Sequence, residues 1–217
     1  MNGVDNMEII RKNLGIYGAN SYIIFNDKNA IVIDCGGDAD TIVKILNERN
    51  LKLEAILLTH GHFDHIGGVE ELRKLTGAKV YGAELERDLF EDANHNLSNG
   101  TLLGEIILKC DNFFKGGDIL EFDAIKLEVV ATPGHTEGGV VFYSKEANAL
   151  FTGDTLFSRS VGRTDLYSGN QEKLESSLIM IAKDFDDGTT IYPGHGPESS
   201  IGYEKANNQY ITTLLNR

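Results

Sequence analysis

One stretch of the chain, Thr59-His60-Gly61-His62-Phe63-Asp64-His65-Ile66-Gly67-Gly68, restricts the possible folds more than any other. It holds four side chains of the kinds that bind divalent metals, and three of them are histidines in a chain that has only six. A short apolar run at 55–58 precedes the stretch and predicts a buried strand. Apolar residues at near-helical spacing follow from Ile66 until Gly77 and predict a helix. The stretch is therefore predicted to connect the C-terminal end of a core strand to the N-terminus of a helix.

The spacing within this loop predicts two neighbouring metal positions. In an extended segment residues two apart point the same way, so His60 and His62 can bind one ion. The chain then bends into the helix, which turns Asp64 and His65 toward a neighbouring point. Imidazole and carboxylate groups suit zinc, iron and manganese. We interpret the stretch as a metal site rather than as a surface loop with a few histidines.

Three later strands are each predicted to end in a further candidate ligand, in the segments Pro133-Gly134-His135, Gly153-Asp154 and Pro193-Gly194-His195. Proline and glycine fix the exit of the chain and let the backbone approach closely, so these side chains are aimed rather than left on a flexible tip. Two four-coordinate ions that share one carboxylate and one water would use six private ligands and one bridging aspartate. The chain offers that number: His60, His62, Asp64, His65, His135, Asp154 and His195.

Strands are predicted at 7–12, 20–26, 30–33, 55–58, 79–81, 119–122, 125–130, 140–143, 149–151 and 190–192. Helices are predicted at 66–76, 84–90, 170–183 and 199–215, and one more is predicted to begin after a cap at Asp38 or Asp40. The polar segment 91–104 is predicted to be a mobile surface loop, a candidate lid, in which His95 is a solvated residue. Asp34 either holds the second nitrogen of a ligand histidine or is a turn aspartate. Cys35 and Cys110 are expected to be packing residues.

The composition limits the classes of binding partner and the cellular compartment that we expect. The formal net charge of −13 argues against nucleic acid and anionic membranes, which need a basic surface. Met1-Asn2-Gly3-Val4-Asp5 lacks the basic and apolar regions of a signal peptide, and no apolar run approaches the length of a membrane span. Two cysteines cannot supply a disulfide framework. We expect a single cytoplasmic domain over residues 1–217.

The ligand pattern His-x-His-x-Asp-His, followed by distant His, Asp and His, resembles that of the metallo-β-lactamase superfamily along nearly the whole chain. The resemblance implies an α/β fold, a four-layer αβ/βα sandwich with the site at one edge of two sheets. It also implies two divalent metal ions, with zinc first and iron or manganese as alternatives. His60, His62 and His135 would hold the first ion, Asp64, His65 and His195 the second, and Asp154 both.

Within the superfamily, the stretch Phe151-Thr152-Gly153-Asp154-Thr155-Leu156-Phe157 resembles hydroxyacylglutathione hydrolases of the glyoxalase II type, and Gly162-Arg163-Thr164-Asp165 resembles their compact bacterial relatives. A lysine that binds a glutathione carboxylate commonly stands where Arg163 stands here, so Arg163 is a candidate substrate-binding residue; the alternative is a surface arginine that pairs with Asp165. We expect no counterpart here of the helical C-terminal domain that helps those enzymes to bind glutathione. Gly196-Pro197 also replaces the tyrosine that commonly follows their last histidine.

The resemblance implies a hydrolase that cleaves a thioester such as S-2-hydroxyacylglutathione by attack of a metal-bound hydroxide, with Asp64 and Asp154 as the catalytic carboxylates and a small anionic substrate. The closest rival is a persulfide dioxygenase with one iron, held by the counterparts of His60, His135 and Asp154. A lactonase shares the full ligand pattern. A secreted β-lactamase, a nuclease and a non-catalytic metal-binding module fit the sequence less well.

Overall fold

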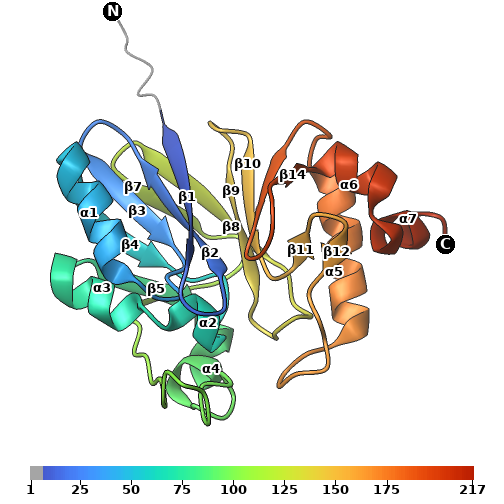
Figure 1. Cartoon of the computed structure of the whole chain (residues 1–217). Helices are drawn as coiled ribbons and strands as arrows, with labels where there is room; N and C mark the ends of the chain where they lie inside the picture. Colours follow the sequence, from blue (N-terminus) through green and yellow to red (C-terminus); the bar gives the residue numbers. More distant parts are fainter. Residues whose placement is uncertain (1–6) are drawn as a thin grey trace, which may run out of the picture.

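A computed structural model describes residues 7–217 and contains two six-stranded sheets (Figure 1). The first sheet has the order β1-β2-β3-β4-β5-β6, and the second β14-β13-β10-β9-β8-β7. The strands are β1 (Glu8–Leu14), β2 (Ala19–Phe25), β3 (Asn29–Ile33), β4 (Lys52–Leu57), β5 (Lys79–Ala83), β6 (Asn112–Phe114), β7 (Ile119–Phe122), β8 (Ile125–Ala131), β9 (Val140–Ser144), β10 (Ala149–Gly153), β11 (Leu156–Phe157), β12 (Ser160–Val161), β13 (Thr190–Pro193) and β14 (Ser199–Ser200).

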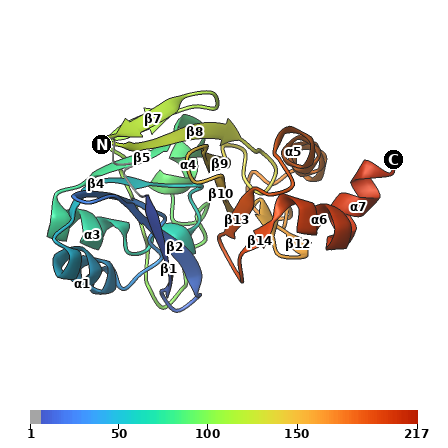
Figure 2. The same ribbon diagram turned by 90° about the horizontal axis from the view of Figure 1, so that it is seen from above.

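Helices cover the outer face of each sheet, so the molecule has four layers (Figure 2). They are α1 (Ala39–Arg49), α2 (Phe63–Ile66), α3 (Val69–Thr76), the 3-10 turn η1 (Glu84–Glu86), α4 (Arg87–Glu91), α5 (Gln171–Asp184), α6 (Ile201–Asn207) and α7 (Gln209–Leu215). Apolar residues of α1 and α3 pack on the first sheet, the facing surfaces of the two sheets form a central core, and α5, α6 and α7 pack on the second sheet. The predicted four-layer αβ/βα sandwich is confirmed.

The strand order explains why residues far apart in the sequence meet at one edge. β4 runs parallel to β3 and β5 in the first sheet, and β10 runs parallel to β13 in the second. Parallel strands bring their carboxyl ends to the same side, and side chains just beyond them therefore gather there. The loops after β4, β8, β10 and β13 carry all of the predicted metal ligands.

Two predicted helices are divided in the structure. The helix expected at 199–215 is interrupted at Asn208, whose backbone is extended and whose side chain accepts a hydrogen bond from Tyr210 N to begin α7. The helix expected from Ile66 begins instead at Val69, because α2 ends at Ile66 and Gly67 and Gly68 separate it from α3. Apolar spacing alone predicted both as continuous, since it registers neither the polar cap at Asn208 nor the break at the two glycines.

The segment after α4 is more firmly packed than predicted. Asn96 and Ser98 are fully buried, and Phe63 N donates to Asn96 O at 3.0 Å, which ties the segment to α2. The side chain of His95 is 32% exposed, so the predicted solvation is met in part, and its ring also stacks on Tyr167 with centroids 3.6 Å apart and an interplanar angle of 5°. Polar composition suggested exposure, but here polar side chains form hydrogen bonds inside the loop.

Two expectations from the sequence concern a signal peptide and membrane-spanning segments. The segment 1–5, from which we expected no signal peptide, lies outside the described residues. Among residues 7–217, no helix is both long and apolar enough to cross a membrane.

Candidate metal centre

The site lies where the chain leaves β4 and enters α2. Beyond β4, Leu58 N donates to Tyr81 O at 3.0 Å and so extends the pairing with β5 past the last assigned strand residue. His62 is still extended, with φ −67° and ψ 146°, and Phe63 begins α2. His60 and His62 therefore leave an extended segment, as their spacing predicted, whereas Asp64 and His65 belong to a helical turn.

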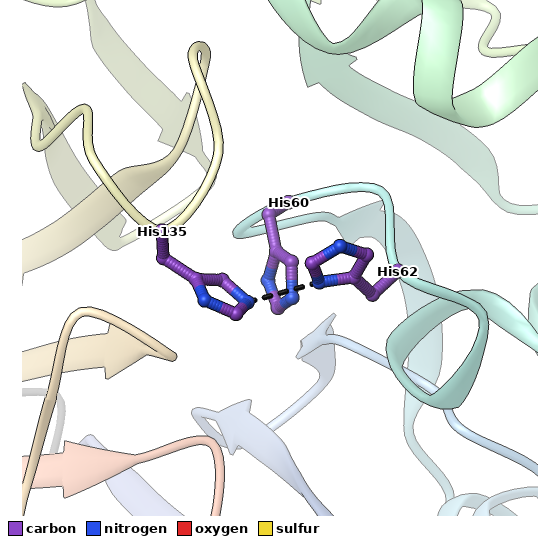
Figure 3. Close-up of side chains that lie close together, drawn as sticks. All are labelled: His60, His62 and His135. Atoms are coloured by element: carbon purple, nitrogen blue, oxygen red, sulfur yellow. Dashed lines mark hydrogen bonds between the residues drawn. The ribbon is translucent and has the colours of Figure 1, made fainter. Parts of the chain in front are cut away.

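The first group of converging ligands is His60, His62 and His135, called here the first triad (Figure 3). One ring nitrogen from each histidine lies within 4.8 Å of the other two. His62 Nδ1 and His135 Nε2 are 2.9 Å apart. All three side chains are buried, so these imidazoles point at one enclosed position.

The second group is Asp64, His65 and His195, called here the second triad, whose ligand atoms also lie within 4.8 Å of one another. His195 Nε2 lies 3.1 Å from Asp64 Oδ2. This group is less enclosed: the side chain of His195 is 32% exposed and that of Asp64 18%, whereas His65 is fully buried. The second triad therefore forms the open side of the site.

Asp154 lies between the two triads. Its Oδ1 is 3.2 Å from His65 Nε2, and its Oδ2 is 3.7 Å from both His135 Nε2 and His195 Nε2. It also groups with His60 and His65 within 4.8 Å. The structure thus brings all seven predicted ligands together, with Asp154 in the position expected of a bridging carboxylate.

A glycine permits this close approach. A Cβ on Gly194 would lie 2.2 Å from Asp154 Oδ1 and 2.7 Å from His65 Cε1, so no side chain fits at that position. The turn before His195 can therefore pass against the bridging aspartate only because residue 194 is glycine.

A hydrogen-bonded network behind the ligands fixes the ring orientation of two histidines. His65 Nδ1 donates to Asp34 Oδ2 at 2.8 Å, so the proposed role of Asp34 as partner of a ligand histidine is confirmed. Thr59 donates to the same carboxylate through its backbone N–H (2.8 Å) and its hydroxyl (2.7 Å). Because the hydroxyl proton is used there, Thr59 Oγ1 accepts from His60 Nδ1 at 3.1 Å. Both histidines then turn Nε2 toward the site.

Thr59 was missed at the sequence level. It precedes the first histidine directly, but a lone threonine beside a metal motif gives no signal without the position of Asp34. The ring of a third histidine, His135, is oriented by a backbone group, since its Nδ1 donates to the carbonyl of Arg163 at 2.8 Å. Every residue has a carbonyl, so the residue type at position 163 could not reveal this contact.

The buried polar atoms test whether these residues fit a metal. Among residues 7–217, His60 Nε2, His65 Nε2 and Asp154 Oδ1 are buried and form no hydrogen bond. Buried polar atoms normally have partners, and unpaired ones need a specific explanation. Atoms of these kinds, facing one another at ligand spacing, fit divalent cations.

The pKa shifts of the metal-free chain differ between the ligands. Burial lowers the pKa of the His62 imidazole to about 3, and burial with the neighbouring His65 lowers that of His60 well below its usual range. Burial alone would raise the pKa of Asp154, but the charge of His65 outweighs it and lowers the pKa well below its usual range. Neutral imidazoles and an ionised carboxylate are the states in which these groups bind metal. Burial alone would lower the pKa of His65, but the carboxylates around it outweigh burial and raise the pKa well above its usual range, so a metal ion has to displace a proton there.

The two cysteines do not take part. Cys35 and Cys110 pack against the core beneath the first sheet, as predicted, and burial raises the pKa of each thiol to about 12. Neither belongs to a cluster of potential metal ligands among the residues that the structure describes.

Arg163 does not join the seven. Its guanidinium forms a two-pronged ion pair with Asp165, both distances being 2.6 Å, and both side chains are largely exposed. This is the alternative considered for Arg163 from the sequence. Its carbonyl, rather than its side chain, contacts a ligand histidine.

Comparison with known proteins identifies the pattern. The family described as "Metallo-beta-lactamase superfamily" matches residues 14–195. The chain is 36% identical over 203 residues to the probable metallo-hydrolase YqgX of Bacillus subtilis, covering 93% of this chain and 96% of that one. It is 35% identical over 211 residues to the hydroxyacylglutathione hydrolase GloC of Haemophilus influenzae, covering 96% of this chain and 99% of that one.

Solved structures agree. The BLEG-1 B3 metallo-beta-lactamase superimposes with a TM-score of 0.88 at 35% identity, covering 94% of this chain and all of that one. TTHA1623, solved in a di-iron-bound form, superimposes with a TM-score of 0.80 at 30% identity, covering 93% of this chain and 99% of that one. The fold and the family are therefore shown, and the cluster together with the family implies divalent metals at this site.

Proposed function

This chain belongs to the metallo-β-lactamase superfamily and is a metal-dependent hydrolase, and from that premise we propose that it uses two metal ions to hydrolyse a thioester such as S-2-hydroxyacylglutathione. The observation that carries the proposal is the position of Asp154 between two complete triads. One triad would hold a single ion; two triads that share a carboxylate suit a pair.

Different residues of the site have different proposed roles. Bound divalent ions would polarise the scissile carbonyl and make water nucleophilic at neutral pH. His60, His62 and His135 form the enclosed group, in which Thr59 orients the ring of His60, and Asp34 orients the ring of His65 in the second triad. The open side at His195 leaves room for the carbonyl to approach. Asp64 and Asp154 are the proposed catalytic carboxylates: Asp154 would help to hold both ions, and Asp64 would help to hold the ion at the second triad.

The leaving group favours a thioester. A thiolate leaves without protonation, whereas an amine needs a proton donor. Each carboxylate and histidine of the cluster is already assigned to a ligand group or to the network behind it. GloC, which covers nearly the whole chain, is named as a hydroxyacylglutathione hydrolase, and this supports the same substrate class here.

The charge of the site favours a small anionic substrate. Asp64 and Asp154 would supply two negative charges against four positive charges of two divalent ions, so the pocket would be cationic within an acidic protein. We propose zinc as the metal, with iron or manganese as alternatives, because imidazole and carboxylate suit all three. The di-iron form of TTHA1623 gives iron particular weight. A cytoplasmic location stays a prediction.

A second candidate is hydrolysis of a β-lactam, favoured by the likeness to BLEG-1. The acyl chemistry is the same, but the leaving group is an amine. A lactonase and a one-iron persulfide dioxygenase are the remaining alternatives on this fold, and the same set of assays separates them.

The test is a substrate panel on protein prepared with balanced zinc, iron and manganese. We expect two metals per chain and faster hydrolysis of an S-2-hydroxyacylglutathione than of a β-lactam or a lactone. Faster β-lactam or lactone hydrolysis would replace the thioester proposal. One iron per chain, with oxygen consumed on glutathione persulfide, would assign the protein as a dioxygenase.

A further inference from the structure

Glu86 is a buried carboxylate that the metal site does not use directly. It ends the turn η1 at the corner between β5 and α4, and its side chain is fully buried. Among residues 7–217 it forms no ion pair with a lysine, arginine or histidine. An unpaired buried carboxylate costs several kcal/mol unless hydrogen bonds compensate it, so its partners indicate its role.

Those partners are backbone amides of the two loops that form the first triad. Gly61 N donates to Glu86 Oε2 at 2.8 Å, and Gly138 N donates to Oε1 at 2.7 Å. Gly61 lies between His60 and His62, and Gly138 lies three positions after His135. One oxygen thus holds the loop after β4, and the other holds the loop after β8.

Both loops press closely against this corner. A Cβ on Gly61 would lie 2.5 Å from Leu89 Cβ, and one on Gly138 would lie 2.8 Å from Glu86 N. The absence of side chains at both glycines lets the two amides reach the carboxylate. Charge-assisted hydrogen bonds of this kind are stronger than neutral ones.

The arrangement has a geometric consequence. His62 lies on the loop after β4 of the first sheet, and His135 lies on the loop after β8 of the second. The two loops are far apart in the sequence, yet a ring nitrogen from each would have to bind the same ion. One backbone hydrogen bond already joins the two segments, since Val140 N donates to Thr59 O at 3.0 Å, and it lies just before His60 and just beyond Gly138. Glu86 adds a second connection, which reaches Gly61 between His60 and His62 and Gly138 on the His135 loop.

We propose that Glu86 is a positioning residue that clamps the His60–His62 turn and the His135 loop together, so that the first triad is set for metal before an ion binds. This role requires the metal site but no particular substrate. It distinguishes the two triads, because Gly61 adjoins both His60 and His62, whereas Asp64 and His65 lie beyond them in α2 and the hydrogen bonds of Glu86 do not extend to the loop of His195. Loss of the clamp should therefore weaken the first triad selectively.

The test uses Glu86→Gln, which keeps the shape but turns an NH2 toward one of the two amides. A matched control is Glu204→Gln: Glu204 is equally buried and accepts from Arg159 N at 2.8 Å and Asn208 Nδ2 at 2.9 Å, away from the first triad. Each substitution is combined with His195→Ala, which leaves the first triad, and with His62→Ala, which leaves the second. Zinc affinity of the metal-free proteins is measured by competition with a fluorescent chelator.

In the His195→Ala background, Glu86→Gln should raise the Kd for zinc by about tenfold or more, the usual cost of a lost outer partner. In the His62→Ala background the change should stay within about twofold. Glu204→Gln should leave both values within the same limit, even where it lowers Tm as much. Equal effects of Glu86→Gln in the two backgrounds, no effect, or an equal effect of Glu204→Gln would overturn the proposal.

If Glu86→Gln folds poorly, Glu86→Asp serves as the second variant. It keeps the charge, but its shorter chain cannot reach both amides. The same selective loss of zinc affinity at the first triad is expected, and unchanged affinity would overturn the proposal.

Discussion

The two triads contain similar ligands but lie in different surroundings. The three histidines of the first triad are almost completely buried and are held from behind by a hydroxyl, a carbonyl and two amide contacts. In the second triad only His65 is fully buried, while the side chain of His195 is 32% exposed. The first triad is therefore the enclosed group, and the second is the group that faces solvent. Asp154 connects the two regions.

The largest effect is expected from Asp154→Asn, because the carboxylate of Asp154 lies against histidines of both triads. An amide has half of the carboxylate's acceptor capacity and no charge, so metal binding should weaken at both positions. Turnover should fall by roughly three orders of magnitude. Metal analysis and kcat/KM check this. Weaker metal binding at one triad alone would contradict the proposal that Asp154 serves both triads.

The second largest effect is expected from Asp34→Asn, which should lower the metal affinities of the two triads by different amounts. Asn tolerates the positive φ of 56° at this position, so Asp34→Asn preserves the backbone while removing the charge that His65 Nδ1 contacts. Metal affinity of the second triad should fall by about 10- to 100-fold. The first triad, reached only through Thr59, should lose less. Zinc titration in the His62→Ala and His195→Ala backgrounds measures both, and a larger loss at the first triad would contradict the network.

The ligand motif was predictable from the sequence, while the surrounding contacts were not. His60, His62, Asp64 and His65 carry their geometry in their spacing, and the strand-end turns revealed the remaining ligands. Glu86 gave no signal, since its partners are backbone amides of two distant loops. Burial of a polar residue depends on tertiary neighbours that hydrophobic periodicity cannot report.

The fold, like the site, could be predicted from the sequence only in part. Periodicity predicted the strands and helices, and the resemblance to the metallo-β-lactamase superfamily predicted the sandwich, but neither predicted the break at Asn208 or the packing of the segment around His95. Both depend on specific side-chain hydrogen bonds and ring contacts. Composition describes the average environment of a segment and misses such contacts.

A smaller effect is expected from Arg163→Ala at the rim of the site. If Arg163 exchanges Asp165 for a substrate carboxylate, KM for an anionic glutathione thioester should rise by about tenfold with kcat largely kept. An uncharged thioester should show no change and serves as the control. Equal changes on both substrates, or none, would leave Arg163 as a surface residue. The contact of its carbonyl with His135 is retained in the variant.

The smallest effect is expected from His95→Ala. His95 contacts neither triad and stacks on Tyr167 instead. kcat and KM should each stay within about twofold of the wild-type values. A loss comparable with that of Asp154→Asn would show that the ligand set is wrong.

Stepwise removal of metal tests the difference between the triads most directly. Protein loaded with zinc is treated with a chelator, and released zinc is followed over time beside the His195→Ala variant. Two ions per chain should leave in two phases, the fast one from the exposed second triad, and the variant should lack that phase. One ion per chain, or two ions released in a single phase that the variant retains, would contradict the account.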